Sequence, residues 1–140
     1  MTLTFPPINL VAVIVTGIAI FFLGAIWYAA LFGKLWQKYH GYTDEQVKAM
    51  QKAKPPAFFF GSMLFAYLLL ATMMAFLVYW TKAETWLDGL ILGLVVFGIA
   101  KAIMITDFIS SNKRKEIYFI DGSYQFCYFI LAGIMLTLWR

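Results

Sequence analysis

Long apolar segments alternate with short polar segments along the whole chain. Four segments, at about residues 8–32, 57–80, 86–108 and 116–139, contain few charged side chains. At about 1.5 Å of rise per residue, a helix of about 20 residues crosses a hydrocarbon core of about 30 Å. Each segment is therefore long enough to span a membrane once. The pattern predicts an all-α, polytopic membrane protein in which residues 1–140 form a single four-span domain.

The polar stretch between the first two spans carries the signals of a short helix. Thr43 and Gln46 fit a capping box, in which each side chain bonds to the other residue's backbone amide. Asp44 and Glu45 precede a series of lysines, an order that suits the helix dipole. The sequence therefore predicts a helix over about residues 44–54. Its apolar stripe is thin, so a helix on the cytoplasmic membrane surface and a solvated connector both fit.

The composition excludes most other classes of protein. Hydrophobic residues make up 63% of the chain and charged residues 13%, whereas soluble domains average about 45–50% and about 25%. The four spans and their loops leave no length for a separate soluble catalytic domain. One histidine and one cysteine provide no zinc or haem ligand set, and no catalytic motif is present. We therefore expect no enzyme activity, no catalytic residue, no cofactor and no metal.

Basic residues are distributed unevenly between the two sides of the predicted bundle. The loops after the first and third spans hold eight of them: Lys34, Lys38, Lys48, Lys52, Lys54, Lys113, Arg114 and Lys115. The other side holds only Lys82 and Arg140. Because cytoplasmic loops carry the excess of Lys and Arg, we expect cytoplasmic long loops and both termini outside. This distribution explains the net charge of +4 without a nucleic-acid site.

Polar side chains inside the last two spans are the candidate functional residues. They are Lys101, Asp107, Asp121 and Gln125. An ionisable group at this depth costs about 2.5–3.5 kcal/mol, so it has a partner or lines a wet cavity. Lys101 lies about 13 Å and Asp121 about 9 Å from the cytoplasmic ends of their spans. A hairpin centred near Ser111 places Lys101 opposite Asp121, and Asp107 opposite Lys115.

The expected pairing of Lys101 with Asp121 has more than one interpretation. A structural ion pair would fix the register of the two helices. A proton relay, an ion relay or a site for a charged solute would use the same residues. A third interpretation is that the lysine extends its ammonium to the cytoplasmic headgroups.

The third span carries a glycine pair at a spacing of four residues. Gly89 and Gly93 form a GxxxG motif, which lets the backbones of two helices approach closely. The contact can lie within the chain or between copies of a homo-oligomer.

Two motifs resemble those of a known family. The first has the pattern G-x-x-W-Y-x-x-L-F-G-x-x-W and contains Gly24, Trp27, Tyr28, Phe32, Gly33 and Trp36. The second begins at Phe119 and contains Asp121, Gly122, Tyr124 and Gln125. The chain resembles the domain of unknown function 1761, a family of small, mostly bacterial membrane proteins. The resemblance covers nearly the whole chain and implies an integral membrane protein of four spans, and it implies no reaction. We expect this protein in a bacterial inner (plasma) membrane.

The first motif also has a physical interpretation. Gly24 and Tyr28 are four residues apart and share a helix face, so the glycine leaves room for a neighbour beside the ring. Trp27 lies deep for an interfacial residue, and its indole N–H therefore needs an internal partner. We expect Trp27 and Tyr28 to pack against protein. A packed helix junction and a wall lining a ligand site both fit.

Several functions are compatible with these features. A small oligomeric transporter or channel for an ion or a small solute is favoured by the charged residues and the glycine-rich spans. The alternatives are a non-catalytic scaffold or accessory subunit of a membrane complex and a protein that binds lipid or another hydrophobic ligand. The lipid bilayer is the one partner that the sequence predicts directly.

Overall fold

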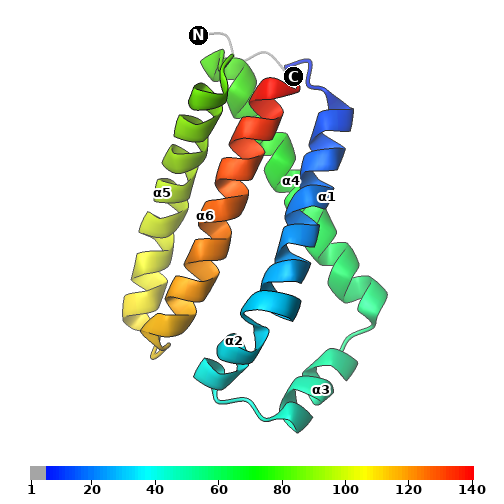
Figure 1. Ribbon diagram of the computed structural model, residues 1–140, viewed down its shortest axis with the longest axis vertical. Helices are drawn as coiled ribbons and strands as arrows, with labels where there is room; N and C mark the ends of the chain where they lie inside the picture. Colours follow the sequence, from blue (N-terminus) through cyan, green and yellow to red (C-terminus); the bar gives the residue numbers. More distant parts are fainter. Residues whose placement is uncertain (1–5) are drawn as a thin grey trace.

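The computed structural model describes residues 6–140, and these residues form helices without strands (Figure 1). The all-α prediction is therefore confirmed. In chain order the elements are α1 (Leu10–Ala25), the π-helix η1 (Ile26–Leu31), α2 (Gly33–His40), α3 (Asp44–Lys52), α4 (Pro56–Thr81), α5 (Trp86–Ser110) and α6 (Lys115–Leu138).

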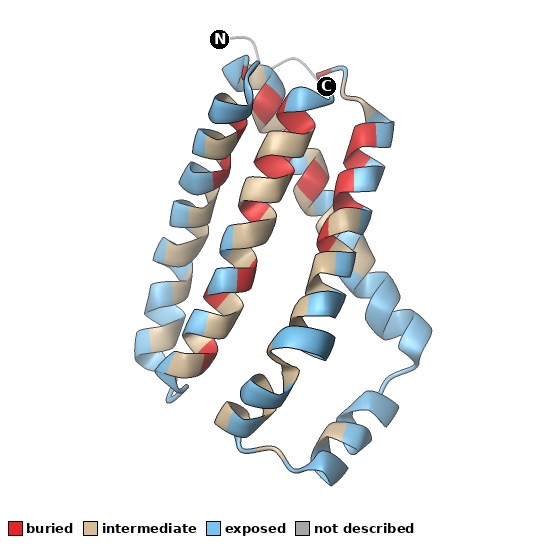
Figure 2. Cartoon of the chain, in the orientation of Figure 1, coloured by how far each residue is buried: buried red, intermediate tan, exposed pale blue. Residues whose placement is uncertain are grey.

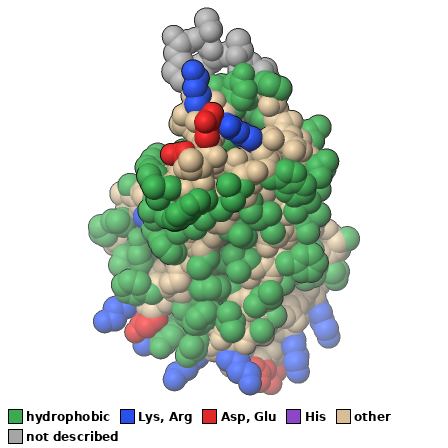
Figure 3. Space-filling model, turned by 45° about the horizontal axis from the view of Figure 1, so that its top comes forward, with side chains coloured by type: hydrophobic (Ala, Val, Ile, Leu, Met, Phe, Trp, Pro, Cys, Tyr) green, Lys and Arg blue, Asp and Glu red, His purple; other side chains and the backbone are tan. Residues whose placement is uncertain are grey.

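Four helical segments are long and apolar enough to cross a membrane. They are Leu10–Leu31, which joins α1 to η1, then Pro56–Thr81, Trp86–Ser110 and Lys115–Leu138. Large apolar side chains cover their outer surfaces, and Phe65 and Ile103 are each 68% exposed. Figure 3 shows a hydrophobic band between charged side chains that gather at the two ends. An outer surface of this kind is stable in lipid, and the chain is a membrane-embedded protein.

The helices do not pack equally against one another. Helices α1, α4 and α6 contact each other, whereas α5 packs almost entirely against α6 (Figure 1). Fully buried side chains include Ile20, Met74 and Val78. Figure 2 shows that buried residues concentrate in the half of the bundle near Arg140, while the half near the long connections is mostly exposed. The second half contains η1 and most of the candidate residues.

The GxxxG motif lies in the contact between α5 and α6. A Cβ atom on Gly89 would lie 2.5 Å from the Gly133 carbonyl oxygen, and one on Gly93 would lie 2.6 Å from the Phe129 carbonyl oxygen. The two backbones touch because these positions carry no side chain. In this structure the motif therefore serves packing within the chain.

The helix ends show what the sequence pattern predicts and what it misses. Thr43 and Gln46 form the expected capping box at the start of α3, with bonds of 3.3 and 2.9 Å. Asn9 also caps α1, accepting bonds of 3.1 Å from two backbone amides. The pattern does not predict α2, which ends at His40 and is capped by Gly41 with a φ of 72°. Glycine directly after a basic last turn is a helix-stop signal and could have revealed α2.

Candidate functional site

The first span ends in a wide helical turn. In η1 the Phe32 amide donates to the Trp27 carbonyl, five residues back, at 2.7 Å. The turn then closes tightly, and a Cβ atom on Gly33 would collide with the Tyr28 carbonyl oxygen. Only glycine fits at that point without moving the backbone. Short π-helical segments are frequent at functional sites, so η1 is the first element of the candidate site.

Two neighbouring residues of η1 bond to two neighbouring residues of α6. The Trp27 indole Nε1 donates to the Ile120 carbonyl oxygen at 3.3 Å. The Tyr28 hydroxyl donates to the Asp121 Oδ1 at 2.6 Å. The expectation that Trp27 and Tyr28 pack against protein is confirmed, and the indole has its internal partner. The Trp27 ring also lies 4.7 Å from the ring of Phe32, centre to centre.

A chain of hydroxyl groups connects α4, α6 and α1 beside these bonds. The Tyr124 oxygen lies 2.9 Å from the Tyr67 hydroxyl and 3.1 Å from the Ile20 carbonyl oxygen. A hydroxyl has one hydrogen to donate, so Tyr67 donates to Tyr124 and Tyr124 donates to Ile20. A Cβ atom on Gly24 would lie 2.7 Å from the Tyr124 oxygen. Gly24 therefore makes room for Tyr124.

We call this arrangement the η1–α6 junction, defined by Trp27, Tyr28, Tyr67, Asp121 and Tyr124. It joins both motifs noted in the sequence. Trp36 extends it from α2, with its ring edge-on to Tyr28 at 6.3 Å between centres. The arrangement is a packed helix junction, because ring contacts and hydrogen bonds fill the space between the elements.

Asp121 has spare capacity to accept hydrogen bonds. In residues 6–140 the one hydrogen bond to its carboxylate comes from Tyr28, although a carboxylate has about four acceptor positions. Gln125 lies one helical turn further along α6 and shares this face. Its Oε1 atom is buried and has no hydrogen-bond partner. Two oxygen acceptors with unused capacity among residues 6–140 thus lie one helical turn apart on the same face of α6.

The expected ion pair between Lys101 and Asp121 is absent from the described part of the chain, whose salt bridges join other residues. The Lys101 Nζ atom instead lies 4.6 Å from the ring centre of Tyr118. A Cβ atom on Gly122 would be 2.9 Å from Nζ. Successive residues of a helix point about 100° apart, so Gly122 faces Lys101 while Asp121 faces η1. The prediction placed the two residues at similar depth but on the wrong sides of α6.

The hairpin also places Asp107 opposite Lys115, and the ion pair of Asp107 forms two residues earlier in the chain. Asp107 pairs with Lys113 at 3.1 Å, not with Lys115, and both side chains are more than half exposed. The reason is that α5 continues to Ser110 and the turn then brings Lys113 back beside Asp107. This pair lies at the end of the span and outside the η1–α6 junction.

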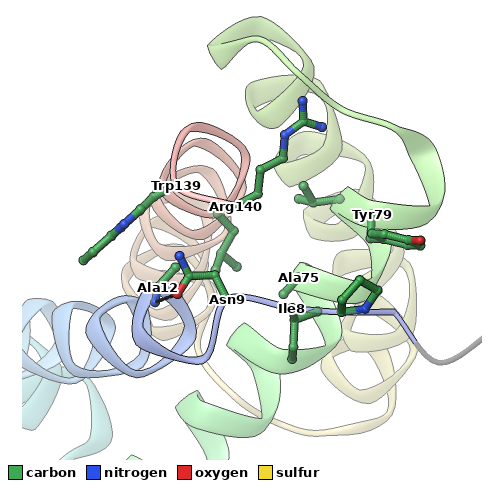
Figure 4. A pocket seen from close by; sticks show the side chains of 10 residues that line it. Ile8, Asn9, Ala12, Ala75, Tyr79, Trp139 and Arg140 are labelled. Atoms are coloured by element: carbon green, nitrogen blue, oxygen red, sulfur yellow. Dashed lines mark hydrogen bonds between the residues drawn. The ribbon is translucent and has the colours of Figure 1, made fainter.

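A small cavity lies at the opposite end of the bundle. It measures about 30 Å³ and lies between α1, α4 and the end of α6, where Asn9, Ala12, Ala75 and Arg140 line it (Figure 4). A space of this size holds about one water molecule. No group of three or more His, Cys, Asp or Glu residues that could hold a metal ion occurs in residues 6–140.

Comparison with known proteins agrees with the motifs. Residues 11–137 match the family described as protein of unknown function (DUF1761). The chain belongs to the DUF1761 family. The resemblance noted in the sequence is thereby confirmed for nearly all of this DUF1761 chain. No curated protein and no solved structure matches it.

One polar member of the junction in this DUF1761 protein, Tyr67, was not predicted from the sequence. Tyr67 lies in the middle of α4 among apolar residues, and its hydroxyl bonds to Tyr124. A tyrosine at such a depth needs a hydrogen-bond partner inside the protein, and that requirement was the available signal. The Ile20 carbonyl had no signal in the sequence, because any backbone carbonyl can accept.

Proposed function

We propose that this protein is a small membrane transporter or channel in which Asp121 binds and releases a proton or a monovalent cation. One observation supports the proposal. Asp121 is a carboxylate within a membrane span that accepts a single hydrogen bond and has no salt bridge among residues 6–140. A structural carboxylate in a membrane is normally paired with a base, whereas a transport carboxylate must exchange its partner.

The surroundings of Asp121 fit a small positive ion. The Gln125 oxygen, one helical turn further along α6, has no donor among residues 6–140, and oxygen atoms are the ligands that hard cations prefer. The Tyr28 oxygen is a third oxygen at the same place, 2.6 Å from the carboxylate. A bound proton or cation would satisfy acceptors that the chain itself leaves unsatisfied.

The hydrogen bond from Tyr28 connects Asp121 to the backbone of η1. A hydrogen bond to a charged acceptor is about twice as strong as a neutral one, so neutralising Asp121 weakens its hold on Tyr28. Tyr28 belongs to η1, where the helical pattern changes to a wider turn. We propose that η1 is the segment that rearranges when Asp121 binds and releases its ion.

Flux measurements test this proposal with a matched pair of variants. Asp121→Asn and Asp107→Asn each remove one carboxylate, inside the span and at its exposed end respectively. Purified protein in vesicles is given a proton gradient or a sodium gradient, and internal dyes report the flux. We expect ion flux from the natural protein and from Asp107→Asn, and loss of about 90% or more in Asp121→Asn. Flux no faster than in protein-free vesicles, or full flux in Asp121→Asn, would contradict the proposal.

The proposed setting is a bacterial inner membrane with the long loops in the cytoplasm. The eight bases of those loops, against two on the other side, support this orientation. A reporter enzyme that works only outside the cytoplasm should be active when fused after Arg140 and inactive when inserted after Gly41. A reporter that works only in the cytoplasm should give the reverse. Cytoplasmic activity of the fusion at Arg140 would overturn the orientation.

We propose that copies of this chain associate with one another and that the protein has no enzyme activity. Gly89 and Gly93 contact α6 of the same chain, so contacts between copies would use other surfaces.

A further inference from the structure

A groove runs along the outer surface between α5 and α6, on a different side of α6 from the η1–α6 junction. Its volume is about 320 Å³. Lys101 lies in it beside Tyr118 and Gly122, and its walls include Phe97, Phe126 and Cys127. Phe126 is 40% exposed, so the groove is open to the molecules that surround the bundle.

The groove contains one positive charge, Lys101, that forms no salt bridge with the described residues. Its Nζ atom lies over the rings of Tyr118 and Phe97, at 4.6 and 5.5 Å from their centres, and 4.0 Å from the sulfur of Met104. A lysine ammonium has three donors, and rings and a thioether are weak acceptors. The ammonium can therefore donate to an anionic oxygen from outside the chain.

The groove extends from the first turn of α6 into the membrane-spanning part of α5 and α6. Helix α5 has 25 residues and is about 37 Å long at 1.5 Å per residue, longer than a hydrocarbon core of about 30 Å. Tyr118 lies three residues after Lys115, the first residue of α6. The Tyr118 ring thus lies in the first turn of α6, near the headgroup level. The Lys101 Nζ atom, 2.9 Å from where a Cβ atom on Gly122 would lie, is about 10 Å from the start of α6. A phosphate that reaches this atom therefore enters the groove past Tyr118, and Phe97 and Phe126 lie deeper.

We propose that this groove binds an anionic phospholipid of the surrounding bilayer. The lipid phosphate accepts from the Lys101 Nζ atom, and one acyl chain lies along Phe126 and Cys127. Gly122 is the position that seats the ammonium, because a Cβ atom there would lie 2.9 Å from Nζ. Charge complementarity selects the phospholipid, and the apolar walls hold its chain. This site is separate from the ion site at Asp121, and neither proposal depends on the other.

The chain provides its own reporter for this proposal. Cys127 is the single cysteine, its thiol is free and partly exposed, and it lines the groove. A membrane-permeant maleimide modifies the thiol, and mass spectrometry follows the rate. The protein is compared in nanodiscs of phosphatidylcholine alone and in nanodiscs that also contain phosphatidylglycerol. We expect phosphatidylglycerol to slow the modification about fivefold, the effect of one basic residue on anionic lipid binding.

Variants show whether the charge of Lys101 causes the protection. Lys101→Met and Lys101→Gln should remove the effect of phosphatidylglycerol, and Lys101→Arg should keep it. Lys54→Met is the matched control, since Lys54 is exposed and distant from the groove in sequence, and it should behave like the natural protein. Native mass spectrometry should show a retained phosphatidylglycerol in Lys101→Arg and Lys54→Met, which keep a basic residue at position 101. Lys101→Met and Lys101→Gln should retain none.

Four results would overturn the proposal. The first is an equal rate with and without phosphatidylglycerol, and the second is protection that persists in the neutral variants. The third is protection by inorganic phosphate in phosphatidylcholine nanodiscs, which would assign the site to a free anion. The fourth is protection in phosphatidylcholine alone that appears only when two copies share a nanodisc, which would assign the groove to a second copy of the chain.

Discussion

Replacing Gly93 with alanine is expected to lower the free energy of unfolding by about 2–3 kcal/mol. The added Cβ atom would lie 2.6 Å from the Phe129 carbonyl oxygen and 3.0 Å from the Ile130 Cα atom. Both neighbours are backbone atoms of α6, so they cannot rotate away as a flexible side chain would. The helices must separate instead, and they then lose van der Waals contact along the whole crossing.

Gly98 provides the control for this prediction on the same helix. A Cβ atom at Gly98 meets nothing within 4 Å, so Gly98→Ala should leave stability unchanged or raise it by up to about 1 kcal/mol through helix propensity. Thermal unfolding in detergent, followed by circular dichroism, compares the two variants. Equal melting temperatures for Gly93→Ala and Gly98→Ala would show that the α5–α6 contact is not as close as described.

Replacing Gly33 with alanine is expected to damage the candidate site and the fold together. Its Cβ atom would collide with the Tyr28 carbonyl oxygen, so the turn that ends η1 must open. Opening shifts Trp27 and Tyr28 away from their partners on α6. Two hydrogen bonds at about 0.5–1.5 kcal/mol each predict a loss of about 1–3 kcal/mol. Ion flux should fall together with stability, because Asp121 loses its partner.

The matched control for Gly33 is Gly61 in α4. Nothing lies within 4 Å of a Cβ atom at that position, and Gly61→Ala should keep natural stability and flux. Unfolding in detergent and flux in vesicles are measured for both variants. A Gly33→Ala protein with natural stability and natural flux would mean that the wide turn of η1 does not position Tyr28.

The sequence predicted the features that depend on composition and local chemistry. Hydrophobic segments of about 20 residues define the spans, since only a helix satisfies its own backbone in lipid. The capping box at Thr43 is a local motif, and it forms as expected. The need of Trp27 for an internal partner followed from its depth in the membrane, and the Ile120 carbonyl meets it.

The sequence could not predict how the helices are rotated about their own axes. Reflection through the α5–α6 turn gives the depth of Lys101 and Asp121, but their directions depend on the rotation of α6. Packing at Gly133, against Gly89, sets that rotation, and it turns Gly122 toward Lys101. The change to a π-helix at Ile26 was also hidden, because an apolar run has the same hydrophobic pattern in an α-helix and in a wider turn.

Infrared difference spectroscopy of the membrane-embedded protein tests most directly whether Asp121 exchanges an ion. Subtracting the spectrum of Asp121→Asn isolates the carboxyl stretch of Asp121. We expect this band to change when the proton concentration of the medium is varied, or to shift when sodium replaces a large organic cation. A band that stays constant under both changes would show a fixed structural carboxyl group and would contradict the proposed ion site.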